Sequence, residues 1–428
     1  MSEDFIQSIK KNYRPRIIDT RFNELLDTFG GVLITGPKWC GKSWSAAKVA
    51  ESAIFIDDAD NAARARLLPE LVLNGVTPRL IDEWQDVPAL WDAARRLIDT
   101  RRKPGQFIFT GSTTPPKERT SHTGTGRFAR LRMRTLTLFE EGLSSGSVSL
   151  KELFDCSGKI QSQLSKYDFS KALKDICNGG WPSNLWTTNK RPGVIAGEYL
   201  KSVVENDLSR ADGIRRDPQM VSLLLRSLAR NSATTVKATT LRQDIIAVEG
   251  DDLISDQTIR SYLQALKDLF IIEEQPSWAP SLRSRKRIRV SPKLHFSDPS
   301  LAAAALGATP ELLQQDIQTA GFLFESICYR DLSVYASAIN GRVHHYQDNA
   351  GLEVDMVITL EDGRWGAIEV KLGVFEFDKA AANLQHLSRK LSGEAPAPSF
   401  LAIVTASGGV AQTRSDGVNV IPLDCLAP

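Results

Sequence analysis

Residues 33–46 read LITGPKWCGKSWSA and place the pattern G-x-x-x-x-G-K-[ST] directly after an apolar run. Gly36 and Gly41 let the backbone curl so that successive N–H groups point at a phosphate, and the dipole of the following helix adds positive potential. In such a loop Lys42 reaches the β- and γ-phosphates of a nucleotide, and the Ser43 hydroxyl ligates Mg²⁺. The predicted phosphate loop comprises Gly36, Pro37, Lys38, Trp39, Cys40, Gly41, Lys42 and Ser43. A glycine-rich turn without a ligand is the alternative, so the rest of the chain has to supply the other parts of a nucleotide site.

Short apolar runs surround this loop at residues 31–36, 53–58, 79–83 and 106–112, with segments of helical periodicity between them. Runs of this kind are typical of parallel strands that are buried on both faces and joined by crossover helices. In open parallel sheets, ligands bind at the carboxyl ends of the strands, which is where the phosphate loop falls. We therefore expect an α/β domain of the P-loop class over residues 1–145.

Two further groups of polar residues end strands of this sheet. Asp82 and Glu83 close the run RLIDE, where one acid can hold Mg²⁺ through water and the next can orient the attacking water. Thr110 and Ser112 end the run QFIFTGS and are candidates for a hydrogen bond to the γ-phosphate or to that water. Either group alone is also common in a plain turn. The position of Asp82 and Glu83, on a strand of the same sheet that follows the phosphate loop, favours the functional interpretation for the two acids, and for Thr110 and Ser112 both interpretations remain open.

Arginines follow in the stretch GRFARLRMR, which begins at Gly126. Three of them alternate with Leu131 and Met133, which is typical of a half-exposed strand. Arg127 follows two glycines in a polar loop and is the arginine best placed to reach a phosphate. It could do so in its own subunit or in a neighbour as an arginine finger, so a homo-oligomer is one possible state.

Composition sets limits on the class of protein. A chain of 428 residues is long enough for about three domains. Its net charge of +2 gives no global attraction to nucleic acid or to an anionic membrane, so any basic patch must be local. The five scattered cysteines form no C-x-x-C pair, which argues against a disulfide framework or a zinc site. No signal peptide and no apolar run of roughly 18 residues is present, so we expect a cytoplasmic protein without a membrane span.

The middle region, residues 146–305, has helical periodicity followed by an apolar run and a basic stretch, RSRKRIRVSPK. This order is typical of a winged helix, whose second helix can enter a major groove of DNA. Its basic residues would contact phosphates. The alternative is an internal module with a charged, solvated hairpin. The candidate contacts are Arg283, Arg285, Lys286, Arg287, Arg289 and Lys293.

The last region, residues 306–428, contains GLEVDMVITLEDGRWGAIEVKL, in which Asp362-Gly363 separates two alternating strand patterns. If the two strands face the same way, Asp355, Glu369 and Lys371 converge. Two carboxylates for Mg²⁺ beside an ammonium are what a metal-dependent phosphodiesterase needs. Glu325, on an apolar helix, is a possible fourth member. An ordinary hairpin with acidic and basic residues is the alternative.

The order of TGPKWCGKS, LIDEWQDVPALWDAARRLID, FIFTGSTTP, GRFARLRMRTLTLFE and GGWP resembles the prokaryotic AAA-superfamily ATP-binding proteins that carry a C-terminal domain of unknown function. The resemblance implies a Walker A motif at Gly36 to Ser43, a Walker B motif at Asp82 and Glu83, and a sensor-like strand end at Thr110 to Ser112. It also implies a winged-helix-like middle region. The pair Trp39-Cys40 departs from the family, where smaller residues are usual.

The C-terminal spacing resembles the PD-(D/E)XK nuclease fold, with Asp355 as the first acid and Glu369 and Lys371 in the second motif. Two functions therefore remain open. One is an ATPase, with ATP and Mg²⁺ as cofactors, whose cycle controls a nuclease-like, DNA-binding domain. The other is a nucleotide-regulated protein-interaction switch whose nuclease-like domain recognises a partner without cleaving it.

Overall fold

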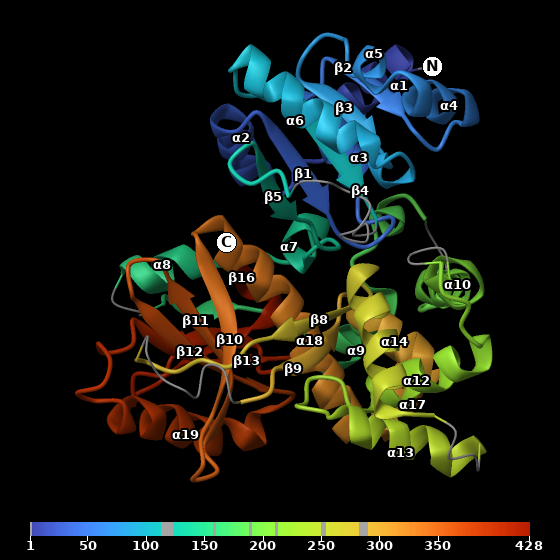
Figure 1. Cartoon of the computed structure of the whole chain (residues 1–428). Helices are drawn as coiled ribbons and strands as arrows, with labels where there is room; N and C mark the ends of the chain where they lie inside the picture. Colours follow the sequence, from blue (N-terminus) through green and yellow to red (C-terminus); the bar gives the residue numbers. More distant parts are fainter. Residues whose placement is uncertain are drawn as a thin grey trace. The chain divides into compact units, whose positions relative to one another are not determined.

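The computed structural model describes residues 2–112, 123–156, 160–187, 191–209, 213–249, 254–281 and 290–428 (Figure 1). The chain forms two compact units. The first comprises Met1–Thr135, Asn206–Arg215 and Ala265–Ile271, and the second comprises Leu136–Glu205, Arg216–Gln264 and Ile272–Pro428. The expected middle and C-terminal regions thus share one unit, and two short segments of the expected middle region belong to the first unit.

The first unit is an α/β fold around a parallel sheet. The strands lie in the order β2-β3-β4-β1-β5, and every neighbouring pair is parallel. The strands predicted from the apolar runs are confirmed. The elements are α1 (Ser2–Asn12), α2 (Asp19–Thr28), β1 (Gly31–Thr35), α3 (Lys42–Val49), β2 (Ser52–Phe55), α4 (Ala59–Leu67), α5 (Pro69–Val72), β3 (Arg79–Asp82), η1 (Trp84–Asp86), α6 (Ala89–Arg101), β4 (Phe107–Gly111) and β5 (Phe128–Arg132).

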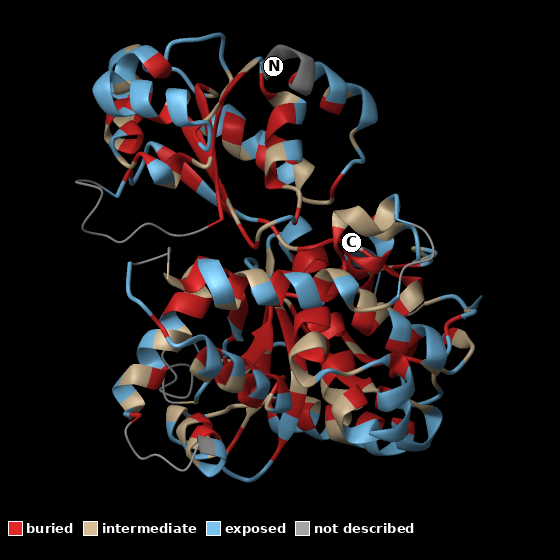
Figure 2. Ribbon diagram, turned by 90° about the vertical axis from the view of Figure 1, so that its right-hand side faces the viewer, coloured by how far each residue is buried: buried red, intermediate tan, exposed pale blue. Residues whose placement is uncertain are grey.

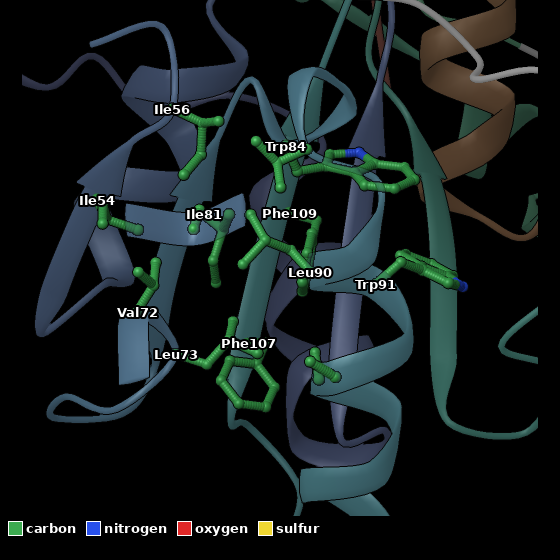
Figure 3. Packing of buried hydrophobic residues seen from close by; sticks show 14 of the residues in the cluster. Ile54, Ile56, Val72, Leu73, Ile81, Trp84, Leu90, Trp91, Phe107 and Phe109 are labelled. Atoms are coloured by element: carbon green, nitrogen blue, oxygen red, sulfur yellow. The ribbon is translucent and has the colours of Figure 1, made fainter. Parts of the chain in front are cut away.

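An aromatic cluster packs the segment after β3 against the sheet (Figure 3). The rings of Trp84 and Trp91 stack with their centroids 5.0 Å apart, and both meet the edge of Phe109 on β4. Trp91 also stacks on Phe128 of β5 at 4.1 Å. Aromatic pairs in these geometries add to the gain from burial. The cluster therefore holds in place the segment that follows the candidate acids Asp82 and Glu83.

The second unit combines helices with a mixed sheet, and Figure 2 shows its buried residues concentrated along the strands and the inner helix faces. Its first part contains α7 (Leu138–Glu141), β6 (Val148–Ser149), α8 (Leu150–Asp155), β7 (Gln163–Leu164), α9 (Phe169–Asn178), η3 (Pro182–Leu185), α10 (Val194–Ser202), α12 (Pro218–Arg230), α13 (Ala238–Glu249) and α14 (Asp256–Asp268). The last turn of α14 belongs to the first unit, and the boundary between the units falls within η4 (Val203–Asp207). Its second part contains β8 (Ile272–Gln275), β9 (Lys293–Phe296), α16 (Pro299–Leu306), α17 (Pro310–Gln315), α18 (Ile317–Ala338), β10 (Gly341–Gln347), β11 (Glu353–Leu360), β12 (Trp365–Lys371), η5 (Val374–Glu376), α19 (Phe377–Lys390), β13 (Phe400–Thr405), β14 (Val410–Thr413), β15 (Asn419–Pro422), η6 (Leu423–Cys425) and β16 (Leu426–Ala427).

The C-terminal sheet has the order β10-β11-β12-β13-β15-β14-β7. The strands β10, β11 and β12 form an antiparallel meander, and β13 adds to β12 in parallel after the crossover helix α19. The predicted turn at Asp362-Gly363 is confirmed, since Gly363 has a φ of 88° between β11 and β12. Helix α18 packs on β10 and β12 and is buried from Leu323 to Ala336.

The helices α12, α13 and α14 are followed by the antiparallel pair β8 and β9, in the order expected from the sequence. The described strands of this hairpin are buried rather than exposed as a wing, and Leu294 of β9 also pairs with Thr234. The expectation that Lys293 contacts DNA phosphates is wrong, because its side chain is buried inside the unit. The other basic candidates, Arg283, Arg285, Lys286, Arg287 and Arg289, lie outside the described residues. No helix in the described part of the chain is long and apolar enough to cross a membrane.

Candidate functional site

The predicted phosphate loop connects the carboxyl end of β1 to the first residue of α3. Gly36 has a φ of 152°, and a Cβ on it would lie 2.1 Å from the carbonyl oxygen of Met133, so no other residue fits there. The Lys42 ammonium is buried and donates to the carbonyl oxygens of Gly36 at 3.0 Å and Pro37 at 2.7 Å. Because charged acceptors make stronger hydrogen bonds than neutral carbonyls, a phosphate is a better partner for this ammonium.

Asp82, the last residue of β3, receives two hydroxyl groups. Ser43 Oγ donates to its Oδ1 across 2.9 Å, and Thr110 Oγ1 donates to the same oxygen. Burial raises the pKa of Asp82 to about 6, and the two hydrogen bonds offset only part of that effect. The Ser43 hydroxyl and the Asp82 carboxylate are hard oxygen donors side by side, which fits Mg²⁺. A cation there would also relieve the cost of the buried negative charge.

Glu83 sits in a strained left-handed conformation, with a φ of 51°. Its carboxylate accepts hydrogen bonds from Gln85 Nε2 and, at 3.4 Å, from Ser112 Oγ. Non-glycine residues in this conformation are held there by their surroundings. The structure thus brings Thr110 to Asp82 and Ser112 to Glu83. It also places Gln85 against Glu83, a contact that was not predicted from the sequence.

Two further contacts hold the phosphate loop and were not predicted from the sequence. The buried guanidinium of Arg16 donates to the Cys40 carbonyl oxygen at 2.9 Å and to that of Arg134 at 3.0 Å. Lys38 forms an ion pair of 2.6 Å with Asp207, a residue far along the chain that returns to the first unit. Trp39 lies at the exposed tip of the loop with 63% of its surface accessible. No local pattern in the sequence marks Arg16 or Asp207.

Arg127 does not lie beside the phosphate loop of its own chain. It precedes β5, and its carbonyl oxygen accepts from the Gly31 N–H at the start of β1, whereas the loop follows Thr35 at the other end. Strand β1, which separates Arg127 from the loop, is about 13 Å long at about 3.3 Å per residue. The guanidinium pairs with Asp99 at 2.9 Å. The expectation that Arg127 reaches a phosphate in its own subunit is therefore wrong, and Arg132, opposite Thr35 in the register, is the arginine at the correct edge.

Asp355 and Lys371 line a cavity of about 510 Å³ in the second unit. Lys371 Nζ lies 2.8 Å from Glu369 Oε2 and 3.5 Å from Asp355 Oδ2. Asp355 Oδ2 also accepts from the Val370 N–H at 2.8 Å, and Glu369 Oε1 accepts from Asn383 at 2.6 Å. The predicted convergence of Asp355, Glu369 and Lys371 is thus present in the geometry.

A second ammonium enters the same cavity. Lys293 Nζ lies 2.8 Å from Glu325 Oε1, 2.9 Å from Glu353 Oε1 and 3.8 Å from Asp355 Oδ1. Burial raises the pKa of Glu325 to about 8, although the charge of Lys293 acts against the shift. For Asp355 the ammonium groups of Lys371 and Lys293 outweigh burial and hold the pKa below its usual range.

These donors do not fit a divalent metal ion as they stand. Lysine ammonium groups already face the carboxylates of Glu325, Glu353, Asp355 and Glu369. In the part of the chain that the structure describes, no group of three or more His, Cys, Asp or Glu side chains is arranged to hold a metal. The predicted metal ligands are therefore brought together, but in contact with lysines.

Comparison with protein families gives a match for the segment that contains the first of these sites. Residues 29–141 match the family model described as "AAA domain", and this segment contains both the phosphate loop and Asp82. These residues form an AAA-type P-loop domain. Beyond the AAA-type domain, residues 171–312 match a domain of unknown function, DUF8612, and residues 320–426 match another, DUF4143.

Similar proteins include Rv2008c of Mycobacterium tuberculosis and Mb2031c of Mycobacterium bovis, both described as uncharacterized. Each is 25% identical over 347 residues, which are 79% of this chain and 70% of the relative. Among solved structures, the Walker-type ATPase PABY2304 of Pyrococcus abyssi has 14% identity and a TM-score of 0.42, over 69% of this chain and 96% of that one. The ORC2 protein of Aeropyrum pernix has 10% identity and a TM-score of 0.32, over 74% of this chain and 94% of that one.

Proposed function

We propose that this protein binds and hydrolyses ATP in its AAA-type domain, and that the nucleotide cycle controls the second unit. The observation that carries the proposal is the hydrogen bond of 2.9 Å between Ser43 and Asp82, which joins the end of the phosphate loop to the end of β3. In this proposal Lys42 binds the β- and γ-phosphates, while Ser43 and Asp82 hold Mg²⁺. When bound, Mg²⁺ neutralises negative charge on the phosphates.

The surroundings of Glu83 support its proposed role as the residue that orients the attacking water. Glu83 directly follows Asp82, the last residue of β3, and the contacts from Gln85 and Ser112 fix the direction of its carboxylate. A carboxylate that accepts a proton from water contributes to the rate only when it is held in place. Thr110, bound to Asp82, orients the acid and is a positioning residue in this proposal.

An ATPase assay of the purified full chain tests both parts of the proposal. We expect Mg²⁺-dependent release of phosphate from ATP, and the rate is measured alone and with single-stranded, duplex and branched DNA. Stimulation by one DNA structure supports coupling to DNA. Hydrolysis that no DNA changes favours a protein partner for the second unit, and a chain that neither binds nor hydrolyses ATP contradicts the proposal.

For the second unit, the additional ammonium of Lys293, which faces Glu325 and Glu353, favours recognition of a partner over cleavage of DNA. We propose that the nuclease-like arrangement of Asp355, Glu369 and Lys371 serves in a recognition domain. The cleavage alternative is tested by incubating the same DNA structures with Mg²⁺ or Mn²⁺, with and without ATP. Cutting that Asp355→Ala or Lys371→Ala stops, while ATP hydrolysis continues, would establish a nuclease and refute the recognition proposal.

A further inference from the structure

Lys293 is a buried cation in the cavity of the second unit. It begins β9, and its side chain is only 4% exposed. Its ammonium meets Glu325 from helix α18 and Glu353 from strand β11, at 2.8 and 2.9 Å, with Asp355 at 3.8 Å. These elements are remote from one another in the sequence, so the tertiary fold brings a single lysine to three acids.

A buried lysine is costly unless its charge is compensated, and so is a buried carboxylate. Glu325 is 8% exposed and its Oε1 accepts from Lys293, so the two groups depend on each other. Glu325 comes from helix α18, and Glu353 and Asp355 come from strand β11. Carboxylate oxygens are the ligands that a hard divalent cation prefers, provided that no lysine intervenes. Here the chain itself places a positive charge among them.

We propose that Lys293 is a built-in cation of this cavity, supplying to Glu325, Glu353 and Asp355 the positive charge that a divalent metal ion would otherwise supply. The cavity therefore binds metal only when Lys293 is removed. This inference rests on the geometry of the second unit and deepens the proposal that this unit recognises a partner without metal-dependent cleavage. It does not depend on the nucleotide site of the first unit.

The test is Mn²⁺ binding to the full-length, nucleotide-free protein, measured by electron paramagnetic resonance and by titration calorimetry. We expect Lys293→Met to bind one Mn²⁺ at least about tenfold more tightly than the parent, since three acids lose their internal cation. Mn²⁺ should also raise the melting temperature of Lys293→Met by more than that of the parent, because a ligand that binds only the folded state stabilises it. The AAA-type domain is identical in both proteins, so any metal bound there cancels in the comparison.

Two matched variants decide the interpretation. Lys293→Arg keeps the positive charge and should not gain Mn²⁺ binding. Adding Asp355→Asn to Lys293→Met should remove the gained binding, because a carboxylate ligand is lost. If Lys293→Met is folded and binds Mn²⁺ no better than the parent, the proposal is wrong.

The parent protein provides an independent test if Lys293→Met does not fold. The proposal requires that the parent shows no Mn²⁺ binding that depends on Asp355. Submillimolar binding by the parent that Asp355→Asn abolishes would overturn it. Because these measurements contain neither ATP nor DNA, failure here leaves the ATPase proposal intact, and a chain without ATPase activity leaves the Mn²⁺ result intact.

Discussion

Ser43 donates its hydroxyl to Asp82 at 2.9 Å, although the two residues are 39 positions apart in the sequence. The contact is possible because β1 and β3 run parallel on either side of β4, so their carboxyl ends lie at the same edge of the sheet. Thr110, at the end of β4 between them, donates to the same carboxylate. The start of α3 and the ends of two strands thus contribute to one oxygen-rich position beside the phosphate loop.

Replacing Lys42 tests the phosphate loop. Lys42→Ala removes the ammonium now held by the Gly36 and Pro37 carbonyls, so we expect ATP hydrolysis to fall by about a hundredfold or more and nucleotide binding to weaken. Phosphate release and binding of a fluorescent ATP analogue measure the two effects. Lys48→Ala, on the exposed side of the same helix, is the control and should behave like the parent. Normal hydrolysis by Lys42→Ala would show that this loop is not the catalytic one.

Replacing Glu83 separates binding from turnover. Glu83→Gln keeps the shape of the side chain and removes its negative charge, so we expect Mg-ATP to remain bound while turnover slows by about a hundredfold. Single-turnover assays measure the rate of hydrolysis, and equilibrium titrations measure the binding of Mg-ATP. Asp86→Asn changes an exposed acid of the same turn and serves as the control. An equal loss of binding and turnover in Glu83→Gln would instead make Glu83 a structural residue.

Mixing subunits tests Arg127 as an arginine finger in a neighbouring subunit, the role that its position in the sheet leaves open. If the protein is an oligomer, combining Arg127→Ala subunits with Lys42→Ala subunits should restore part of the ATPase activity, because some interfaces then pair an intact loop with an intact arginine. Arg130→Ala, an exposed arginine of the same strand, is the control. Absence of rescue in an oligomer shown by native mass spectrometry to be mixed would place Arg127 outside the site.

Arg16 is predicted to stabilise the phosphate loop through its hydrogen bond to the Cys40 carbonyl oxygen. Arg16→Met leaves the buried carbonyl oxygen of Cys40 without its charged donor, so we expect the free energy of unfolding of the first unit to fall by about 2 kcal/mol. Nucleotide binding should weaken in parallel. Urea unfolding followed by tryptophan fluorescence measures the first effect, and Arg14→Met, at an exposed position, is the control. Unchanged stability in Arg16→Met would show that the loop does not depend on this contact.

His345 should make the second unit sensitive to acid. Burial, with the charge of Lys293 nearby, lowers the pKa of His345 to about 4, and its Nε2 donates to the Ser291 carbonyl oxygen. The unfolded chain binds a proton at its ordinary pKa of about 6.5, so stability is lost as the pH falls from about 6.5 to about 4.

His345→Gln keeps a donor for Ser291 and cannot titrate, so between pH 7 and pH 4.5 it should lose about 2 kcal/mol less stability than the parent. Urea unfolding at the two pH values measures the difference. His386→Gln, at an exposed histidine, is the control. Equal losses in His345→Gln and the parent would mean that other groups set the acid sensitivity.

The phosphate loop can be predicted from the sequence, as can the strands of the first sheet and the turn at Asp362-Gly363. These features depend on local causes: glycine at positions of unusual φ, apolar runs that suit buried strands, and alternation on either side of a tight turn. The same local rules brought Asp355, Glu369 and Lys371 to one place, because a tight turn sets the register of two adjacent strands.

Which charged side chains meet cannot be predicted in this way, because it depends on the folded chain. Arg127 lies at the far edge of the sheet from the phosphate loop because parallel pairing with β1 fixes its position, and the sequence around it carries no record of that pairing. Lys293 belongs to a basic stretch typical of a solvated surface, yet it is buried against acids of α18 and β11. Arg16 supports a loop residue, Cys40, that lies 24 positions later in the chain. Burial and pairing of charges depend on contacts between distant segments, so they follow from the folded chain and not from any local pattern.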